Sequence, residues 1–339
     1  MSAMNLSAAI PALLALVLVG CGGQVTNREP TEAPVRPEQP DIVLIVIDTL
    51  RADRLSCYGN ERQTSPNIDA LALRGARFEN AFAPAPWTLP STASMLTGRL
   101  PQVHGAGLSG MNRDMNTATP LGPSADIPTL AQHLDENGYA TRAFVTNPYL
   151  TFGLERGFQT FEHKDTEGAD VANFADMALA EADLERPLFL LLHFMDCHDP
   201  LLTPDQDARA LSDAGLLPQI WSRTFETLPR SVVGREERLL AYDASIHYVD
   251  RQVGRILDSL QRSGRADNTI VLVTSDHGEE LFEHAAIESE PSFGLPSHRP
   301  AGLGHGHSLF DEVLRVPFVI AGPNIPAGQT IATDITLMD

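Results

Sequence analysis

The sequence predicts an α/β fold built on a mostly parallel sheet. Residues 42–47 (IVLIVI) and 269–274 (TIVLVT) are unbroken runs of aliphatic and β-branched side chains, which is typical of strands buried on both faces. Segments with apolar residues at helical spacing lie between such runs, and strands that alternate with helices favour a parallel sheet. The chain has 339 residues, of which 43% are hydrophobic, so it can bury a sizeable core.

Five strands and five helices follow from these patterns. The predicted strands span residues 42–47, 139–145, 187–194, 269–274 and 316–320. The predicted helices span residues 66–75, 91–98, 127–134, 171–182 and 242–264. The first helix shows the kind of evidence used: Ser65 is a good N-cap, Pro66 suits a first turn, and Gly75 suits a helix end.

The charge balance limits the partners of the protein. The chain carries 44 acidic and 24 basic side chains, a net charge of −20, and its only lysine is Lys164. Phosphate backbones are held by basic patches, so this composition excludes a general nucleic-acid-binding function. Long-range attraction of polyanions is excluded as well, so an anionic ligand has to be held by local groups.

The N-terminal segment predicts export and lipid anchoring. Residues 1–20 are uncharged, and the apolar run 8–19 is too short to span a bilayer but suits the core of a signal peptide. The run ends in LVGC, residues 18–21, which resembles the lipobox of bacterial lipoproteins, where the Cys is diacylated. We expect a signal peptide over 1–20, a proline-rich tether over 21–40, and a lipid-anchored protein of the bacterial cell envelope, periplasmic or surface-exposed. The alternative is an ordinary cleaved signal with an incidental cysteine.

Charged residues and histidines follow three of the predicted strands. Asp48 comes after the first strand, Asp196 and His198 after the third, and Asp276 and His277 after the fourth. In open α/β sheets, ligands bind beyond the carboxyl ends of the strands, so these distant segments can meet at one site. A single Asp after a strand is usually a turn or cap residue. Three such strand ends together favour a metal or anion site.

Five sequence blocks carry a family resemblance. In chain order they are DIVLIVIDTLRADRLSCYGN, SPNIDALALRGARFENAFA, PWTLPSTASMLTGRLPQVHG, TSDHGEEL and GHGHSLFDEVLRVPFVIAGP. They resemble the sulfatase family of the alkaline-phosphatase superfamily over residues 41–339. The resemblance implies a doubly wound α/β sandwich and a metal-dependent enzyme of sulfate or phosphate esters. Because the family usually continues beyond this point, we expect the C-terminal subdomain to be missing from the chain.

The resemblance also implies a metal site. Its ligands would be Asp48, Asp276 and His277, which follow the first and fourth predicted strands. The family resemblance implies one Ca²⁺, and carboxylates with one imidazole also suit Mg²⁺, Mn²⁺ or Zn²⁺. Many sulfatases have a second Asp directly after the first, where this chain has Thr49.

Three residues that sulfatases use in their usual chemistry are replaced by threonine in this sequence. Sulfatases oxidise a Cys or Ser to formylglycine, but this chain has Thr88 at that position, and Thr cannot give formylglycine by that route. Thr92 stands in the place of the motif's Arg. Thr146 stands in the place of a sulfate-binding Lys, within GYATRAFVTNP. We therefore expect no formylglycine and an ester that is held by other groups.

Thr88 is instead the predicted nucleophile. It resembles the nucleophilic Thr of phosphoethanolamine and glycerophosphate transferases in the same superfamily. It also lies near the start of a predicted helix, whose dipole favours an alkoxide and an anionic ester. His198, His305 and His307 are the candidate general acids, since imidazole exchanges protons near neutral pH; they can also bind a second metal.

Three functions remain open at this stage. The first is a hydrolase or transferase of phosphate or sulfate esters that uses Thr88, with phosphoryl transfer favoured. The second is a catalytically inactive module that binds sulfated or phosphorylated glycans, in which Thr88 only caps its helix. The third is sulfate ester hydrolysis by an unmodified Thr88. The anionic ester can belong to a glycan, a lipid head group or a small molecule.

Overall fold

In the computed structural model, the chain folds around a mostly parallel sheet, as the sequence predicts. The structure describes residues 39–109, 118–201, 207, 210–211, 235–290 and 301–339. The predicted signal peptide, and the tether up to residue 38, lie outside the described residues. Within the described part, no helix is long and apolar enough to cross a membrane.

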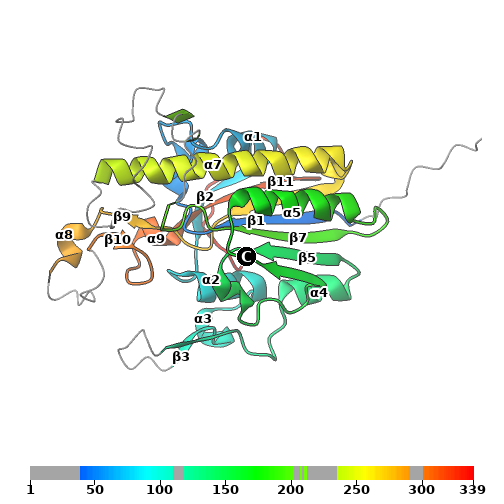
Figure 1. Cartoon of the computed structure of the whole chain (residues 1–339), viewed down its shortest axis with the longest axis horizontal. Coiled ribbons are helices and arrows are strands. Elements are labelled where there is room, and N and C mark those ends of the chain that lie inside the picture. Colours follow the sequence, from blue (N-terminus) through cyan, green and yellow to red (C-terminus); the bar gives the residue numbers. More distant parts are fainter. Residues whose placement is uncertain (1–38, 110–117, 202–206, 208–209, 212–234, 291–300) are drawn as a thin grey trace, which may run out of the picture. The chain divides into compact units, whose positions relative to one another are not determined.

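The central sheet contains the five predicted strands and four others. Its strands are β1 (Asp41–Ile47), β2 (Ala76–Phe82), β5 (Ala140–Val145), β6 (Thr160–His163), β7 (Leu188–Phe194), β8 (Thr269–Thr274), β11 (Arg315–Ala321), β12 (Gln329–Ile331) and β13 (Ile335–Thr336). They lie in the order β12, β2, β11, β8, β1, β7, β5, β6, with β13 also beside β2 (Figure 1). β11 is antiparallel to both β2 and β8, whereas the other described pairs of this sheet are parallel.

Two short antiparallel strand pairs stand apart from the central sheet. β3 (Gly107–Ser109) pairs with β4 (Thr119–Leu121), and β9 (Glu280–Leu281) pairs with β10 (Leu303–Gly304). The second pair joins segments on either side of residues 285–302, which the sequence shows as a polar insertion.

Helices cover both faces of the central sheet. They are α1 (Pro66–Arg74), α2 (Thr88–Thr97), α3 (Pro101–His104), α4 (Leu130–Glu136), α5 (Gly168–Glu181), α7 (Arg235–Arg262), α8 (Ala285–Glu288) and α9 (Asp311–Leu314). Along β1, Val43, Ile45 and Ile47 join a buried cluster with α1, α5 and α7. Leu44 and Val46 join a second cluster with α2 and α4. Figure 1 shows these two sets of helices on opposite sides of the strands. Alternating side chains of one strand thus give the doubly wound arrangement.

The predicted elements differ from the structure mainly at their ends. Helix α4 begins at Leu130 rather than at residue 127, because Thr129 and Gln132 form a capping box there. Helix α7 begins at Arg235 rather than at residue 242. The sequence missed β2 and β6 because both strands are only partly buried and carry polar residues, so neither shows an unbroken apolar run.

Asp196, which follows β7, caps helix α5. Its Oδ1 accepts the backbone N–H of Gly168 at 2.9 Å, while its Oδ2 is buried without a hydrogen-bond partner among the described residues. Burial raises the pKa of Asp196 from 3.8 to about 6. Asp196 therefore has the cap role that a lone Asp after a strand usually has.

The turn that follows β1 is held by α7 and by the end of β8. The Tyr242 hydroxyl donates to the carbonyl of Thr49 at 2.5 Å and accepts the N–H of Arg51 at 2.9 Å. The hydroxyl of Ser275 accepts the N–H of Leu50, also at 2.9 Å. All five residues are buried, so water cannot replace these bonds and the turn has a fixed orientation.

Replacing Tyr242 by Phe should destabilise the protein by about 1–3 kcal/mol, because the Arg51 N–H and the Thr49 carbonyl would stay buried without this partner. Urea unfolding followed by circular dichroism measures the change. The matched control is Tyr149→Phe, since the Tyr149 hydroxyl has no hydrogen-bond partner among the described residues. The control should stay within about 0.5 kcal/mol of the wild type. Equal stability of Tyr242→Phe and wild type would contradict the role given to Tyr242.

Asp196→Asn should show a pH-dependent gain in stability. The folded protein holds the Asp196 proton up to about pH 6, whereas the unfolded chain releases it near 3.8, so the wild type loses stability as pH rises between these values. The variant keeps an acceptor for Gly168 and avoids this loss, which amounts to at most about 3 kcal/mol. Unfolding free energies of both proteins at pH 4 and pH 8 test this: the difference should appear only at pH 8. The exposed Asp165→Asn should show no such dependence.

Candidate active site and metal centre

The carboxyl ends of four adjacent parallel strands meet at one edge of the sheet. Asp48 lies just beyond β1, Asn147 beyond β5, and Asp276 and His277 beyond β8, while His193 is the next-to-last residue of β7. Because β8, β1, β7 and β5 are neighbours in this order, side chains from distant parts of the sequence converge there. Asn147 is 3% exposed and the other four residues are fully buried.

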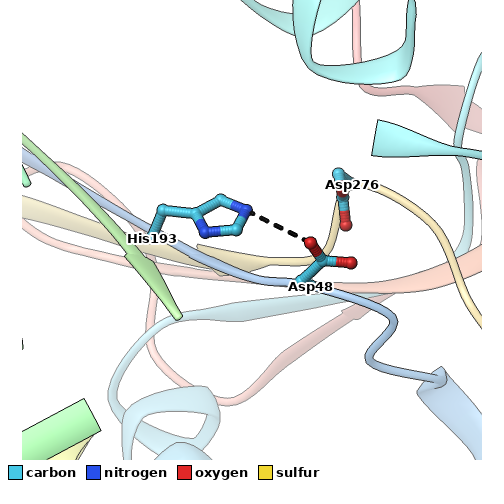
Figure 2. A group of neighbouring side chains, drawn as sticks. All are labelled: Asp48, His193 and Asp276. Atoms are coloured by element: carbon cyan, nitrogen blue, oxygen red, sulfur yellow. Dashed lines mark ion pairs between the residues drawn. The ribbon is translucent and has the colours of Figure 1, made fainter. Parts of the chain in front are cut away.

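Asp48, His193 and Asp276 together offer the donor atoms of a cation site. One ligand atom from each lies within 4.8 Å of the others, and His193 Nε2 is 3.7 Å from Asp48 Oδ2 (Figure 2). Asp48 Oδ1, Asp276 Oδ2 and His193 Nε2 are buried, and none of them has a hydrogen-bond partner within the described part of the chain. Buried polar atoms are nearly always satisfied, so three such atoms in one group fit a cation site.

His277 presents a fourth donor to the same group. Its Nδ1 is 2.8 Å from the carbonyl of Gly278, which can only accept, so Nδ1 carries the proton. The lone pair of Nε2 therefore faces Asp48 Oδ1 and Asp276 Oδ2, each at 3.5 Å. A lone pair and two carboxylate oxygens repel one another unless a cation lies between them.

His193 is oriented in the same way. The Thr146 hydroxyl donates to the carbonyl of His193 at 3.1 Å, so its oxygen accepts from His193 Nδ1 at 3.4 Å. The lone pair of His193 Nε2 then faces Asp48. Thr146, at the position of the family's lysine, thus orients a neighbouring imidazole.

The protonation states of the group favour a cation as well. Burial raises the pKa of Asp276, and the charge of Asp48 raises it further. Burial acts in the same direction on Asp48, but the surrounding imidazoles, with His198 first among them, outweigh it and lower its pKa to about 2. Burial lowers the pKa of His193 to about 4 and that of His277 to about 3. Carboxylates and neutral imidazoles are ligands of divalent cations, so these residues fit such an ion.

Thr49 lies directly beside this group without offering its side chain to it. Its hydroxyl donates to the carbonyl of Asp48 at 2.6 Å, and its N–H is 3.4 Å from Asp276 Oδ1. The backbone of Thr49 has a φ of 61°, in the left-handed region that a β-branched residue rarely adopts. The hydrogen bonds of Tyr242 and Ser275 to this turn hold it there.

Thr88 lies at the first position of α2. Its hydroxyl contacts two of the four donor residues Asp48, His193, Asp276 and His277, which together are called the cation group. Oγ1 is 3.3 Å from His277 Nε2 and 3.5 Å from Asp48 Oδ2. Asn147 Nδ2 donates to Asp48 Oδ2 at 2.7 Å and reaches Thr88 Oγ1 at 3.3 Å. The N-cap of the helix is Trp87, so the Thr88 hydroxyl points to the group and is not the cap of its own helix.

Two of the three predicted general acids lie beside the cation group. The ring centroid of His305 is 4.4 Å from that of His277 and 5.1 Å from that of His198. His305 Nδ1 is 2.9 Å from Oε2 of the buried Glu279, which orients the ring. His307 has different neighbours: its Nε2 lies 3.1 Å from Oε1 of Glu288.

Sequence reasoning missed three residues of this site. His193 was hidden inside a strand whose other residues are apolar, although it is the next-to-last residue of that strand. Asn147 directly follows Thr146, the residue that stands in place of the expected sulfate-binding lysine. Glu279 lies two residues after His277, and only its bond to His305 identifies it as part of the site. Of these, only Asn147 lies beyond the end of its strand, so a search of the residues after each predicted strand could have found it.

The chain is similar to known proteins in sequence and in fold. The chain is 26% identical to a sulfatase of Formosa agariphila, over 96% of this chain and 72% of that protein. It has the fold of the phosphonate monoester hydrolase of Agrobacterium radiobacter, with a TM-score of 0.67 and 22% identity over 89% of this chain and 72% of that one. It also has the fold of a protein solved in complex with its substrate D-glucosamine-2-N,6-O-disulfate, with a TM-score of 0.70 and 18% identity over 89% and 75%.

The matched region determines the family. The chain spans between 59% and 73% of the length of the curated relatives that it matches. The model of the sulfatase family matches residues 40–339, which include every described residue of the site. The chain therefore belongs to the sulfatase family.

Proposed function

We propose that the protein is a metal-dependent ester hydrolase or transferase in which Thr88 attacks the phosphorus of an anionic phosphate ester. The observation that carries this proposal is the position of Thr88 Oγ1, 3.3 Å from His277 Nε2 and 3.5 Å from Asp48 Oδ2. A nucleophilic hydroxyl needs neighbours that favour its ionised form, and Thr88 has them.

Several features of the site favour an ionised Thr88. A divalent ion held by Asp48, Asp276 and His277 or His193 would supply positive charge to the hydroxyl and to the ester. The amino end of α2, a helix of 10 residues, directs its dipole at the same point. The Asn147 amide reaches Thr88 Oγ1 at 3.3 Å and can stabilise negative charge on it.

His305 is the best placed general acid. Burial would raise the pKa of Glu279, but the neighbouring His305 outweighs burial and the pKa falls to about 2. An ionised Glu279, 2.9 Å from Nδ1, favours a protonated His305 ring. The Thr88 hydroxyl gives its proton to Asp48 Oδ2 or His277 Nε2, which it contacts. As its oxygen forms the bond to phosphorus, the bond to the leaving oxygen breaks, and that oxygen takes a proton from His305 or His198. Water or an acceptor alcohol then removes the phosphoryl group from Thr88.

The chemistry of the binding groups favours phosphate over sulfate as the substrate. Thr88 cannot give formylglycine, and the only lysine of the chain, Lys164, lies on the surface, where it pairs with Asp170 at 3.2 Å. The similar fold of a phosphonate monoester hydrolase supports phosphoryl chemistry, while the family membership keeps sulfate esters as a second substrate class. The solved relative with a sulfated glucosamine supports a glycan as one carrier of the ester; a lipid head group or a small molecule are the others.

Thr88→Val should lower kcat/KM by about a thousandfold or more, because it removes the nucleophilic oxygen at nearly constant volume. Thr88→Ser should keep part of the activity. Thr97→Val is the matched control, since Thr97 lies in the last turn of the same helix and its hydroxyl bonds only to the carbonyl of Ala93. The assay uses purified protein with Mg²⁺, Mn²⁺, Ca²⁺ or Zn²⁺ and chromogenic phosphodiesters, phosphomonoesters and sulfate esters.

The outcomes of this assay separate the three functions. A phosphoryl group trapped on the peptide that contains Thr88 would support the proposal, and equal turnover by wild type and Thr88→Val would overturn it. Sulfate release that depends on Thr88 would establish sulfate ester hydrolysis. Binding of metal and glycan without turnover of any ester would establish the inactive binding module.

We also propose that the protein is lipid-anchored at the bacterial cell envelope, on the strength of the LVGC motif at residues 18–21. The full chain, expressed in a bacterium with labelled palmitate, should carry the label and sediment with membranes. Cys21→Ala should lose the label, whereas Cys57→Ala should keep it. A labelled Cys21→Ala protein would rule out the anchor at this cysteine.

A further inference from the structure

A second buried group of metal-ligating side chains lies beside the active site. Glu280 is in β9, Glu288 is the last residue of α8, and His307 follows β10. One ligand atom from each of the three lies within 4.8 Å of the others. Glu280 is fully buried, and Glu288 is 2% exposed. The group is separate from Asp48 and Asp276, and the proposed reaction does not use it.

Each carboxylate of this group is fixed by one oxygen and presents the other. Glu280 Oε1 accepts the N–H of His284 at 3.0 Å, and Glu288 Oε2 accepts the N–H of Gly302 at 2.7 Å. Glu280 Oε2 and Glu288 Oε1 are buried and have no hydrogen-bond partner among the described residues. Both of these oxygens lie near His307, whose Nε2 is 4.0 Å from Glu280 Oε2 and 3.1 Å from Glu288 Oε1; the same nitrogen is 3.2 Å from Glu288 Oε2. The backbone thus aims two buried oxygens at one point.

The histidine of the group presents a lone pair to the same point. His307 Nδ1 is 3.1 Å from the carbonyl of His305, which can only accept, so Nδ1 is the donor. In the neutral ring, the lone pair of Nε2 then faces carboxylate oxygens, which it repels. A cation between the three groups would turn this repulsion into coordination.

Among the described residues, cationic side chains close to this group pair with other carboxylates. Arg51 and Arg235 both form ion pairs with Glu283. His284, which is half-buried, pairs its ring with Glu312.

We propose that Glu280, Glu288 and His307 bind a second divalent cation, of the Zn²⁺ or Mn²⁺ class, which holds helix α8 against the loop that carries His305. Two carboxylates and one imidazole suit either ion, and the three ligands come from three separate segments. His307 and His305 are separated only by Gly306, which has a φ of 79°, and Gly304 has a φ of 105°. Such a glycine-flanked loop gains order when one of its side chains is fixed.

Metal counting tests this proposal. Wild-type protein freed of metal and then loaded with excess Zn²⁺ should retain two ions per chain after desalting, as measured by elemental mass spectrometry. Glu288→Gln, which keeps the shape of the side chain, should retain one. Glu290→Gln is the matched control because Glu290 lies two residues further along and is exposed, and this variant should retain two. The same two ions in Glu288→Gln as in the wild type would overturn the proposal.

The test also separates this site from the one proposed for catalysis. Asp276→Asn should retain one ion, bound through Glu280, Glu288 and His307. If Asp276→Asn retains two ions, the catalytic centre is misassigned and the second site still stands on the Glu288→Gln result. Calorimetric titration of wild-type protein with Zn²⁺ needs no variant: two binding events support the second site, and one event overturns it. Hydrogen exchange of residues 303–308 should slow on Zn²⁺ binding in wild type and Glu290→Gln but not in Glu288→Gln.

Discussion

The repulsion between the two buried carboxylates of Asp48 and Asp276 is the constraint on which the rest of the structure depends. They follow adjacent parallel strands, so the sheet itself brings them together. A buried charge without a partner costs several kcal/mol, and the fold must offset this cost locally. It does so with hydrogen bonds from Asn147 to Asp48 and from the N–H of His277 to Asp276. The donor atoms of Asp48, His193 and Asp276 fit a divalent ion that lies between the two carboxylates.

The same charge logic applies to the whole chain. The chain has a net charge of −20, and its one lysine lies on the surface. Bound cations, the amino end of α2 and protonated histidines can each supply positive charge to an anionic ester. A second ion at Glu280 and Glu288 would extend this strategy, because it would reduce the negative charge close to His305.

The sequence predicted the sheet and the residues that follow its strands because these depend on simple rules. Unbroken apolar runs identify strands buried on both faces, and Asp48, Asp276 and His277 are the first polar groups beyond such runs. His193 escaped prediction because it lies inside a run and its orientation depends on Thr146, a residue from another strand. Asp196 obeyed the strand-end rule but caps a helix, since its neighbour in space is Gly168.

Other features depend on contacts that one sequence does not reveal. Strand β2 needs the neighbours β11 and β12 to be recognised as a strand, because its own residues are mixed in polarity. Glu288 lies in a polar insertion and reads as a surface residue, yet Gly302 and His307 bury it. In both cases, residues that are remote in the sequence determine the environment.

The left-handed backbone of Thr49 has a consequence for how the metal centre can change. Asp and Asn tolerate this conformation better than a β-branched residue does, so the turn already has the shape that an added carboxylate requires. A single substitution could therefore add an oxygen donor between Asp48 and Asp276 without refolding the loop. A larger share of oxygen donors favours Ca²⁺ or Mg²⁺ over ions that prefer imidazole. In this protein, a change at one residue of the turn would thus alter the donor set, while the sheet that positions the site stays unchanged.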